Sequence, residues 1–160
     1  MELKEIMAAF AAETGMQELK PDDGGVFHVM IDEMPVSFGE IKDAGQLVTL
    51  AQVCEPPPET RNRLYRVLME AMHMGTATGG AMFSVAPDGE MIYLQRFDAL
   101  QALDYDGFKS MLEKFVNVLE QWRGIIAVFR VVAPVLEGAG AEEDAELRQF
   151  RLGGDGIIRG

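Results

Sequence analysis

The sequence predicts an α+β fold, a single domain whose antiparallel twisted sheet of about five strands carries three helices in the order α-β-β-β-α-β-β-α. Two apolar-rich runs flank Pro87-Asp88-Gly89, three residues that favour a tight turn, so these runs predict a hairpin. Apolar side chains then recur every three or four positions over residues 105–122, which is typical of an amphipathic helix. A hairpin and a striped helix both need a partner surface, so we expect this helix to cover the sheet that contains the hairpin.

The first half of the chain predicts one helix and three strands. The helix has a shared apolar face, formed by Leu3, Ile6, Met7 and Phe10, and Gly15 ends it. A linker rich in turn residues, 15–25, leads to the first strand at 26–32, which is apolar on both sides. A second strand follows around Val36 and Phe38, and a third at 46–54.

The second half begins with three prolines, 56–58, which end the third strand. A helical pattern starts at Glu59, and Gly75 is expected to end it. The hairpin and the last helix follow, and the apolar stripe of that helix consists of Tyr105, Phe108, Met111, Leu112, Phe115, Val118, Leu119 and Trp122. We predict that the domain spans 1–136 and that 137–160 form a flexible, acidic, Gly-rich tail.

Composition excludes several classes of function. The 160 residues carry a formal net charge of −12, which disfavours both nucleic acid and anionic membranes as partners. A single cysteine, Cys54, allows no internal disulfide, so we expect a reducing, cytoplasmic setting. The first residues lack the pattern of a signal peptide, and no apolar run reaches the roughly 20 residues that span a bilayer.

No group of residues predicts catalysis, a metal site or a cofactor. His28 and His73 are the only histidines, and neither lies in a metal-binding motif. The glycines at 75–80 lack the lysine and hydroxyl residue of a phosphate-binding loop. Asp104 and Asp106 lie at a helix start, where aspartates are expected as caps rather than as calcium ligands. We therefore expect a protein that binds others and is not an enzyme.

The 11 methionines leave two interpretations open. Methionine is flexible and polarizable, so it suits surfaces that repack around varied apolar partners. It also fills irregular gaps in ordinary cores. The methionines are spread over nearly every predicted element and outline no single groove.

The second half of the chain resembles the type III secretion chaperones, the Tir-chaperone-like or class I group. The residues that carry the resemblance are Thr78 to Ser84, Pro87-Asp88-Gly89 and Ile92-Tyr93-Leu94, followed by Leu103-Asp104 and the apolar positions Phe108, Leu112, Phe115, Val118 and Trp122. The resemblance covers roughly residues 1–130. It departs at 70–74, where members of that family often carry an asparagine after a small residue.

The resemblance implies a small homodimer without enzymatic activity, which binds the extended N-terminal region of a secreted effector protein and keeps it ready for export. An apolar effector-binding patch would be supplied by Leu3, Ile6, Met7, Phe10, Val36, Phe38 and Val48. The dimer contact would be supplied by Leu64, Val67, Leu68, Met82 and Ser84. Burial in the core of a single chain is an equally open interpretation for both sets.

Two other functions remain open on the sequence. One keeps the fold and makes the chain a regulatory or scaffolding module for another cytoplasmic protein. The other is a small-molecule enzyme or ligand-binding domain, which would need a polar pocket that few residues of this sequence could line.

Overall fold

The computed structural model describes residues 1–17 and 19–136, with side chains as far as Arg130. The predicted tail, 137–160, lies outside the described residues. The helices are α1 (Leu3–Thr14), α2 (Arg61–Ala71) and α3 (Tyr105–Leu136). The strands are β1 (Phe27–Ile31), β2 (Met34–Ile41), β3 (Gln46–Cys54), β4 (Met82–Val85) and β5 (Ile92–Ala99), and short 3-10 turns lie at Lys42–Ala44, His73–Gly75 and Leu100–Ala102.

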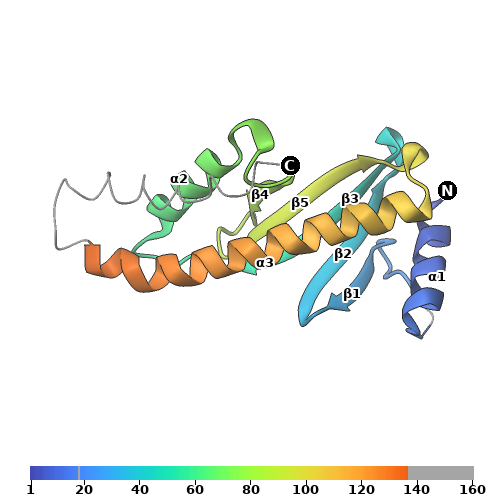
Figure 1. The fold of residues 1–160 in the computed structure, drawn as a ribbon, viewed down its shortest axis with the longest axis horizontal. Coiled ribbons are helices and arrows are strands. Elements are labelled where there is room, and N and C mark those ends of the chain that lie inside the picture. Colours follow the sequence, from blue (N-terminus) through green and yellow to red (C-terminus); the bar gives the residue numbers. More distant parts are fainter. Residues whose placement is uncertain (18, 137–160) are drawn as a thin grey trace.

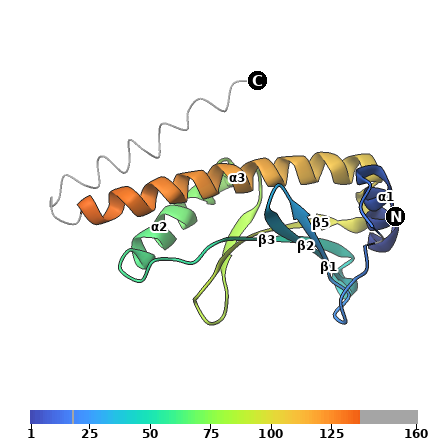
Figure 2. The same ribbon diagram turned by 90° about the horizontal axis from the view of Figure 1, so that it is seen from below.

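The strands form one antiparallel sheet in the order β1-β2-β3-β5-β4, so β1 and β4 are its two edges. Figure 1 shows α3 running along this sheet, with α1 beside its N-terminal half and α2 beside its C-terminal half. Figure 2 shows α3 running along one side of the sheet, α1 and α2 near the two ends of the sheet, and no helix along its other side. The predicted α+β fold and its element order are confirmed.

The core lies between α3 and the sheet because the face of β3 that is turned to α3 is buried and mostly apolar. Along β3, Leu47, Thr49, Ala51 and Val53 are buried while the residues between them are not. Phe108 of α3 is fully buried, and its ring centroid lies 5.9 Å from that of Phe10 in α1 and 5.5 Å from that of Phe38 in β2. Each large side chain buried in this way contributes roughly 1.5–3 kcal/mol before the cost of ordering.

Two elements differ from the prediction. Helix α3 continues past Trp122 to Leu136, because Ile126 and Phe129 extend its buried stripe by two more turns. Helix α2 ends at Ala71, four residues before Gly75, and the chain turns through Met74, whose φ of 61° is in the left-handed region. A non-glycine residue in that region is held there at some cost by its surroundings.

The predicted end of the first helix is confirmed. Gly15 has a φ of 69°, and its backbone N–H donates to the Ala11 carbonyl, which is a glycine C-cap. At the other end, the Glu2 backbone N–H donates to Glu5 Oε2 at 2.9 Å, as part of a capping box.

Candidate functional site

The predicted effector-binding residues are mostly inside the monomer. Leu3, Ile6, Met7, Phe10, Val36 and Phe38 are all buried in the core between α1, the sheet and α3. Val48 is the exception, because it lies half-buried on the side of β3 that faces away from the helices. The six buried side chains could meet a partner only if α1 moved, so in this conformation Val48 alone offers contact area.

The predicted dimer residues divide in the same way. Leu64 and Leu68 are buried beneath α2 in the core, and Val67 is half-buried beside them. Met82 is exposed and Ser84 is half-buried, and both lie on β4 at the edge of the sheet. Alternation along the strands places Met82 and Ser84 on the same side of the sheet as Val48.

This side of the sheet, which no described helix covers, is the main unassigned surface, and we call it the open face. Val48 lies opposite Phe97 in the register, and Met82 lies opposite Gln95, which pairs with Leu50. Phe97, Met82, Ile41 and Met30 are 37%, 42%, 41% and 62% exposed. The apolar members of the open face are Met30, Ile41, Val48, Leu50, Met82 and Phe97.

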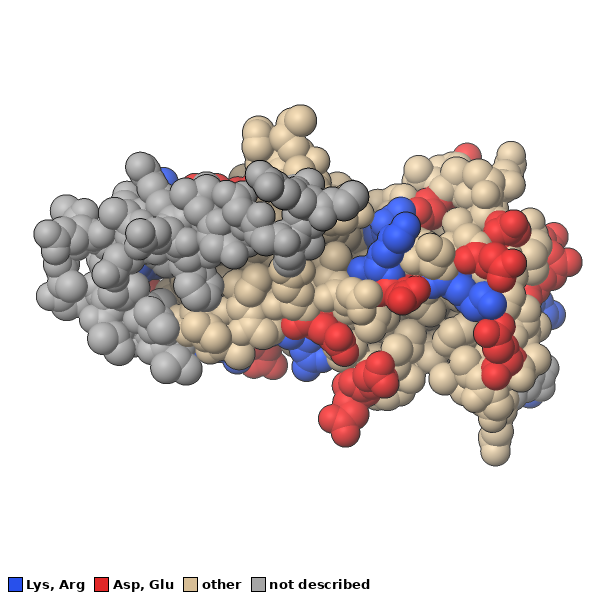
Figure 3. Space-filling model, viewed as in Figure 1, with Lys and Arg blue, Asp and Glu red and all other residues tan. Residues whose placement is uncertain are grey.

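The strand residues of the open face include no aspartate, glutamate, lysine or arginine, and the carboxylate of Asp22 contacts His28 beside β1. Its polar members are His28, Ser37, Ser84, Gln46, Gln52, Tyr93 and Gln95. This contrasts with a chain in which 25% of residues are charged, and Figure 3 shows acidic and basic side chains scattered over the helix-bearing side. A surface with few charged side chains and several exposed apolar ones has the composition of a protein contact surface.

Sequence reasoning missed Met30, Ile41, Leu50 and Phe97 as members of one surface. The alternation along 46–54 separates Val48 and Leu50 from the core residues, so part of the signal was present. The missing information was which side the helices cover, since both sides of the strands are apolar.

The two sheet edges differ in how open they are. At β4, the Phe83 backbone N–H donates to the sulfur of Met72 at 3.0 Å, so the residue that follows α2 already occupies part of that edge. At β1, the neighbouring strand β2 lies on one side only, and the outer edge faces away from the sheet. An added strand from a partner would therefore meet less competition at β1 than at β4.

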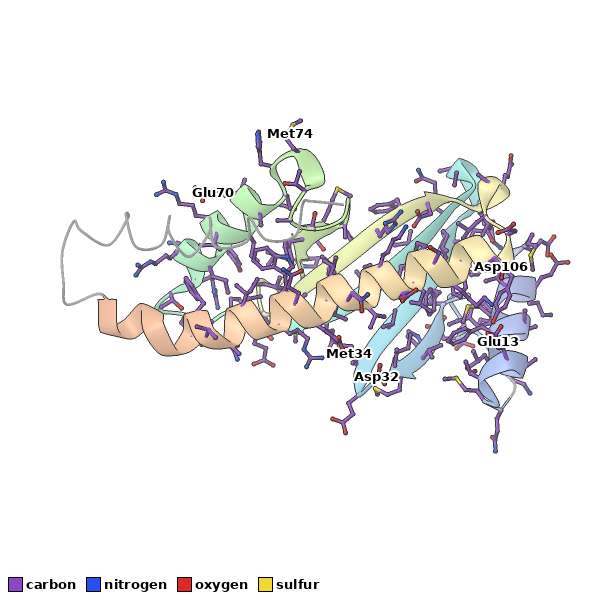
Figure 4. All side chains as sticks on the ribbon, viewed as in Figure 1. Glu13, Asp32, Met34, Glu70, Met74 and Asp106 are labelled. Carbon is purple, nitrogen blue, oxygen red and sulfur yellow. The ribbon has the colours of Figure 1, made fainter. Side chains whose placement is uncertain are left out.

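Among the described residues, three exposed methionines lie in the stretch from α2 to β4, and three others, Met1, Met16 and Met30, lie elsewhere. Met69 of α2 is 69% exposed and Met74 of the following turn is 81% exposed, and Figure 4 shows Met74 at the outer tip of this turn. Met82 of β4 lies in the same part of the chain, whereas Met7, Met34 and Met111 are buried in the core. Both interpretations of the methionines therefore apply, to different residues.

One cluster has the composition of a catalytic triad but not its environment. His28 Nδ1 lies 2.9 Å from Ser37 Oγ, and His28 Nε2 lies 3.0 Å from Asp22 Oδ2. A hydrolytic triad buries its aspartate and adds donors for an oxyanion, whereas the Asp22 side chain is 46% exposed.

Asp22 closes a loop instead. Its Oδ1 accepts the backbone N–H groups of Gly24 and Val26, each at 2.9 Å. The bond from Val26, followed by that from His28, lowers the pKa of the Asp22 carboxyl group. We therefore assign this cluster a structural role, which is to hold the loop before β1.

Within the described residues, no group of three or more histidine, cysteine or carboxylate side chains could hold a metal ion. The expected cap is present at the start of α3, where the Gly107 backbone N–H donates to Asp104 Oδ1 at 2.8 Å. Among residues 1–17 and 19–136, no helix is both long enough and apolar enough to span a membrane.

A comparison with protein-family models matches residues 5–123, from within α1 to one residue past Trp122, to the Tir chaperone protein (CesT) family. The chain belongs to the Tir chaperone protein family. The resemblance that was inferred from the hairpin and the last helix is thereby confirmed. No curated protein matches the chain.

Several solved structures share the fold of this Tir chaperone family member. A chain in the crystal structure of the ExsC–ExsE complex superposes with a TM-score of 0.65 at 18% identity, covering 77% of this chain and 95% of that one. A chain in the HopA1–SchA chaperone–effector complex gives 0.63 at 16% identity, covering 76% and 92%. The Yersinia pestis type III secretion chaperone SycH, in complex with a fragment of YscM2, gives 0.56 at 18% identity, covering 74% and 98%.

The structural matches cover a larger share of each neighbour than of this member of the Tir chaperone family. The neighbours are matched over nearly their whole length, while about a quarter of this chain lies outside each match. The family match likewise ends at residue 123. The end of α3 and segment 137–160 therefore lie outside the family match.

Proposed function

We propose that this chain is a cytoplasmic type III secretion chaperone, which binds the extended N-terminal region of a secreted effector and keeps it competent for export. The observation that carries the proposal is the open face, whose strand residues carry no aspartate, glutamate, lysine or arginine and include several exposed apolar side chains, on a member of the Tir chaperone family. One of the similar structures is itself a chaperone–effector complex. In this proposal the chain acts by binding, without catalysis.

The geometry suits an extended ligand. A polypeptide in the extended conformation presents side chains at a period of two, which matches the spacing of Val48 and Leu50 along β3. The edge of β1 can add a strand through backbone hydrogen bonds, which hold a segment in place without requiring a particular sequence. The apolar rows of the open face then select for apolar side chains in the bound segment.

The effector site we propose differs from the patch that was predicted. It keeps Val48 and adds Met30, Ile41, Leu50 and Phe97, which are accessible without any movement of α1. The other six predicted residues, from Leu3 to Phe38, support the site from below by fixing the sheet against α1 and α3.

Replacing Val48 and Phe97 together by aspartate is expected to abolish capture of the effector. The chain is immobilised, incubated with cytoplasm of its native cell, and the captured secreted protein is identified by mass spectrometry. The N-terminal segment of that protein, fused to an unrelated globular carrier, is then titrated. A buried unpaired carboxylate costs at least about 1–3 kcal/mol, so two should weaken binding by roughly 100-fold or more.

The matched control is Val128→Asp, because Val128 is also exposed, at 46%, but lies on α3 away from the open face. It should leave the affinity for the carrier fusion unchanged. Undiminished capture by the Val48→Asp/Phe97→Asp variant would remove the open face from the mechanism, and capture of the carrier alone would remove the chaperone role.

We also propose that the chain is a homodimer, whose contact involves α2 and β4. Met69, Met74 and Met82 are the exposed apolar side chains that favour this part of the surface, with Leu64, Val67, Leu68 and Ser84 supporting or flanking them. Light scattering coupled to gel filtration is expected to give twice the mass of 17.6 kDa at micromolar concentration. A stable monomer under those conditions would contradict the proposal.

The regulatory or scaffolding role remains the second candidate, since the same open face could bind a folded cytoplasmic partner. The carrier fusion distinguishes the two candidates. An effector segment that binds while it is unfolded supports the chaperone role, and a partner that binds only when it is folded supports the scaffold.

A further inference from the structure

Segment 137–160 has a composition of its own. Its first part, 137–146, is rich in glycine, alanine and carboxylates. Its second part, 147–159, has three arginines, Arg148, Arg151 and Arg159, and only one acidic residue, Asp155. The same part carries five apolar side chains, which are Leu147, Phe150, Leu152, Ile157 and Ile158. A spacer therefore leads to a short basic and apolar sequence on an otherwise acidic chain.

We propose that residues 147–159 bind the open face of their own chain when no effector is present, and that an effector displaces them. The inference rests on the proposed function, since it makes this segment an internal competitor at the effector surface. The segment lies beyond the family match, which ends at residue 123.

The first support is chemical complementarity. The apolar side chains of 147–159 match the apolar rows around Val48 and Phe97. The positive arginines are complementary to the negative charge at the rim of the sheet. The three turns between neighbouring strands carry one lysine, Lys42, and five acidic residues, which are Asp32, Glu33, Asp43, Asp88 and Glu90. Figure 4 shows Asp32 at the outer tip of the β1–β2 turn.

The second support is reach. Helix α3 has 32 residues, so at 1.5 Å per residue it is about 48 Å long. An extended chain spans up to about 3.3–3.6 Å per residue, so the ten residues of the spacer alone reach about 33–36 Å. Phe150 lies 14 residues beyond Leu136 and can reach about 46–50 Å, which is the full length of α3. The sheet is therefore within range of the tethered segment.

The third support is the state of the surface itself. A monomer in water rarely leaves a contiguous apolar patch of several large side chains uncovered. A tethered segment has an effective concentration on the order of millimolar, so even a weak contact is substantially occupied. A ligand that binds more tightly can still replace the segment. Its apparent affinity is then its intrinsic affinity multiplied by the fraction of chains whose open face is free.

The test uses the full chain with a photo-reactive phenylalanine analogue in place of Phe150 and no effector present. Irradiation is expected to give a cross-link within one chain, onto the strands that carry Val48 and Phe97, as mapped by mass spectrometry. The Val48→Asp/Phe97→Asp variant should reduce this product at least about fivefold. The same analogue in place of Ala139 is the control, and it should give no product that depends on Val48 and Phe97.

A second variant avoids any change in the sheet. Phe150→Asp/Leu152→Asp alters only residues outside the described core, and it should raise the fluorescence of the apolar dye ANS severalfold. It should have no such effect in the Val48→Asp/Phe97→Asp background. Cross-links onto α2 or α3, cross-links only to a second copy, or an unchanged dye signal would each overturn the proposal.

This test can fail separately from the proposed function. Capture that depends on Val48 and Phe97, without a cross-link from position 150, leaves an effector-binding chaperone whose added segment lies elsewhere. A cross-link onto the open face, without any captured effector, leaves the internal contact and removes the chaperone role.

Discussion

Replacing Phe108 by alanine is expected to lower the free energy of unfolding by about 3–5 kcal/mol, which is a large part of the stability of a domain of this size. Phe108 is fully buried where α1, β2 and α3 meet. Truncation loses the transfer free energy of the ring and leaves a cavity between Phe10 and Phe38 that the surrounding backbone cannot fill. Urea denaturation followed by far-ultraviolet circular dichroism measures the change.

Phe97→Ala is the matched control, because it removes the same atoms from the open face, where the side chain is 37% exposed. It should change the free energy of unfolding by no more than about 1 kcal/mol. Equal losses in the two variants would mean that Phe97 is buried in solution, either by segment 147–159 or by a second copy of the chain. A small loss for Phe108→Ala would contradict the packing of α1 and α3 on the sheet.

Replacing Trp122 by alanine is expected to cost a similar 3–5 kcal/mol and also to loosen β4. Trp122 is 6% exposed, its ring centroid lies 5.3 Å from that of Phe83, and its Nε1 donates to the Ala77 carbonyl at 2.8 Å. One side chain thus fixes both β4 and the turn before it to α3. Dichroism follows unfolding, and hydrogen exchange at β4 should become faster relative to β2 and β3.

Trp122→Phe separates the two roles of this side chain. It keeps a ring against Phe83 but leaves the Ala77 carbonyl without its donor, so a loss of about 1–3 kcal/mol is expected. If β4 and α2 form the dimer contact, Trp122→Ala should weaken the dimer more than Trp122→Phe does. An alanine variant with an unchanged dimer and unchanged exchange at β4 would contradict this coupling.

The sequence pattern predicted where the strands lie and which residues alternate between their two sides. It did not predict which side the helices cover. Both sides of the strand at 26–32 are apolar, and Val48 and Leu50 are as apolar as Leu47 and Ala51. Apolar periodicity therefore identified strands and helices correctly. The family resemblance assigned six core residues, together with the half-buried Val48, to one binding patch, and periodicity could not separate them. Burial depends on which face α3 covers, and that is a property of the assembled layers.

Local signals explain where the predicted boundaries were right and where they were not. Gly15 ends α1 because the apolar periodicity stops there and glycine readily adopts the positive φ of a helix C-cap. At the end of α2 the same signal misled, because the chain leaves the helix at Ala71 and places Met74 in the left-handed region. Contacts from residues distant in sequence, such as that from Met72 to Phe83, involve this turn and are invisible to a local pattern.

The sequence by itself determined the element order, the α+β class, the amphipathic last helix and the resemblance to the secretion chaperones, because these depend on turn chemistry and periodicity within short windows. Only the tertiary structure decided which apolar residues are core and which form the open face. The physical reason is that a side chain is buried by residues far away in the chain, so its exposure is settled only when α3 lies on one side of the sheet and leaves the other bare.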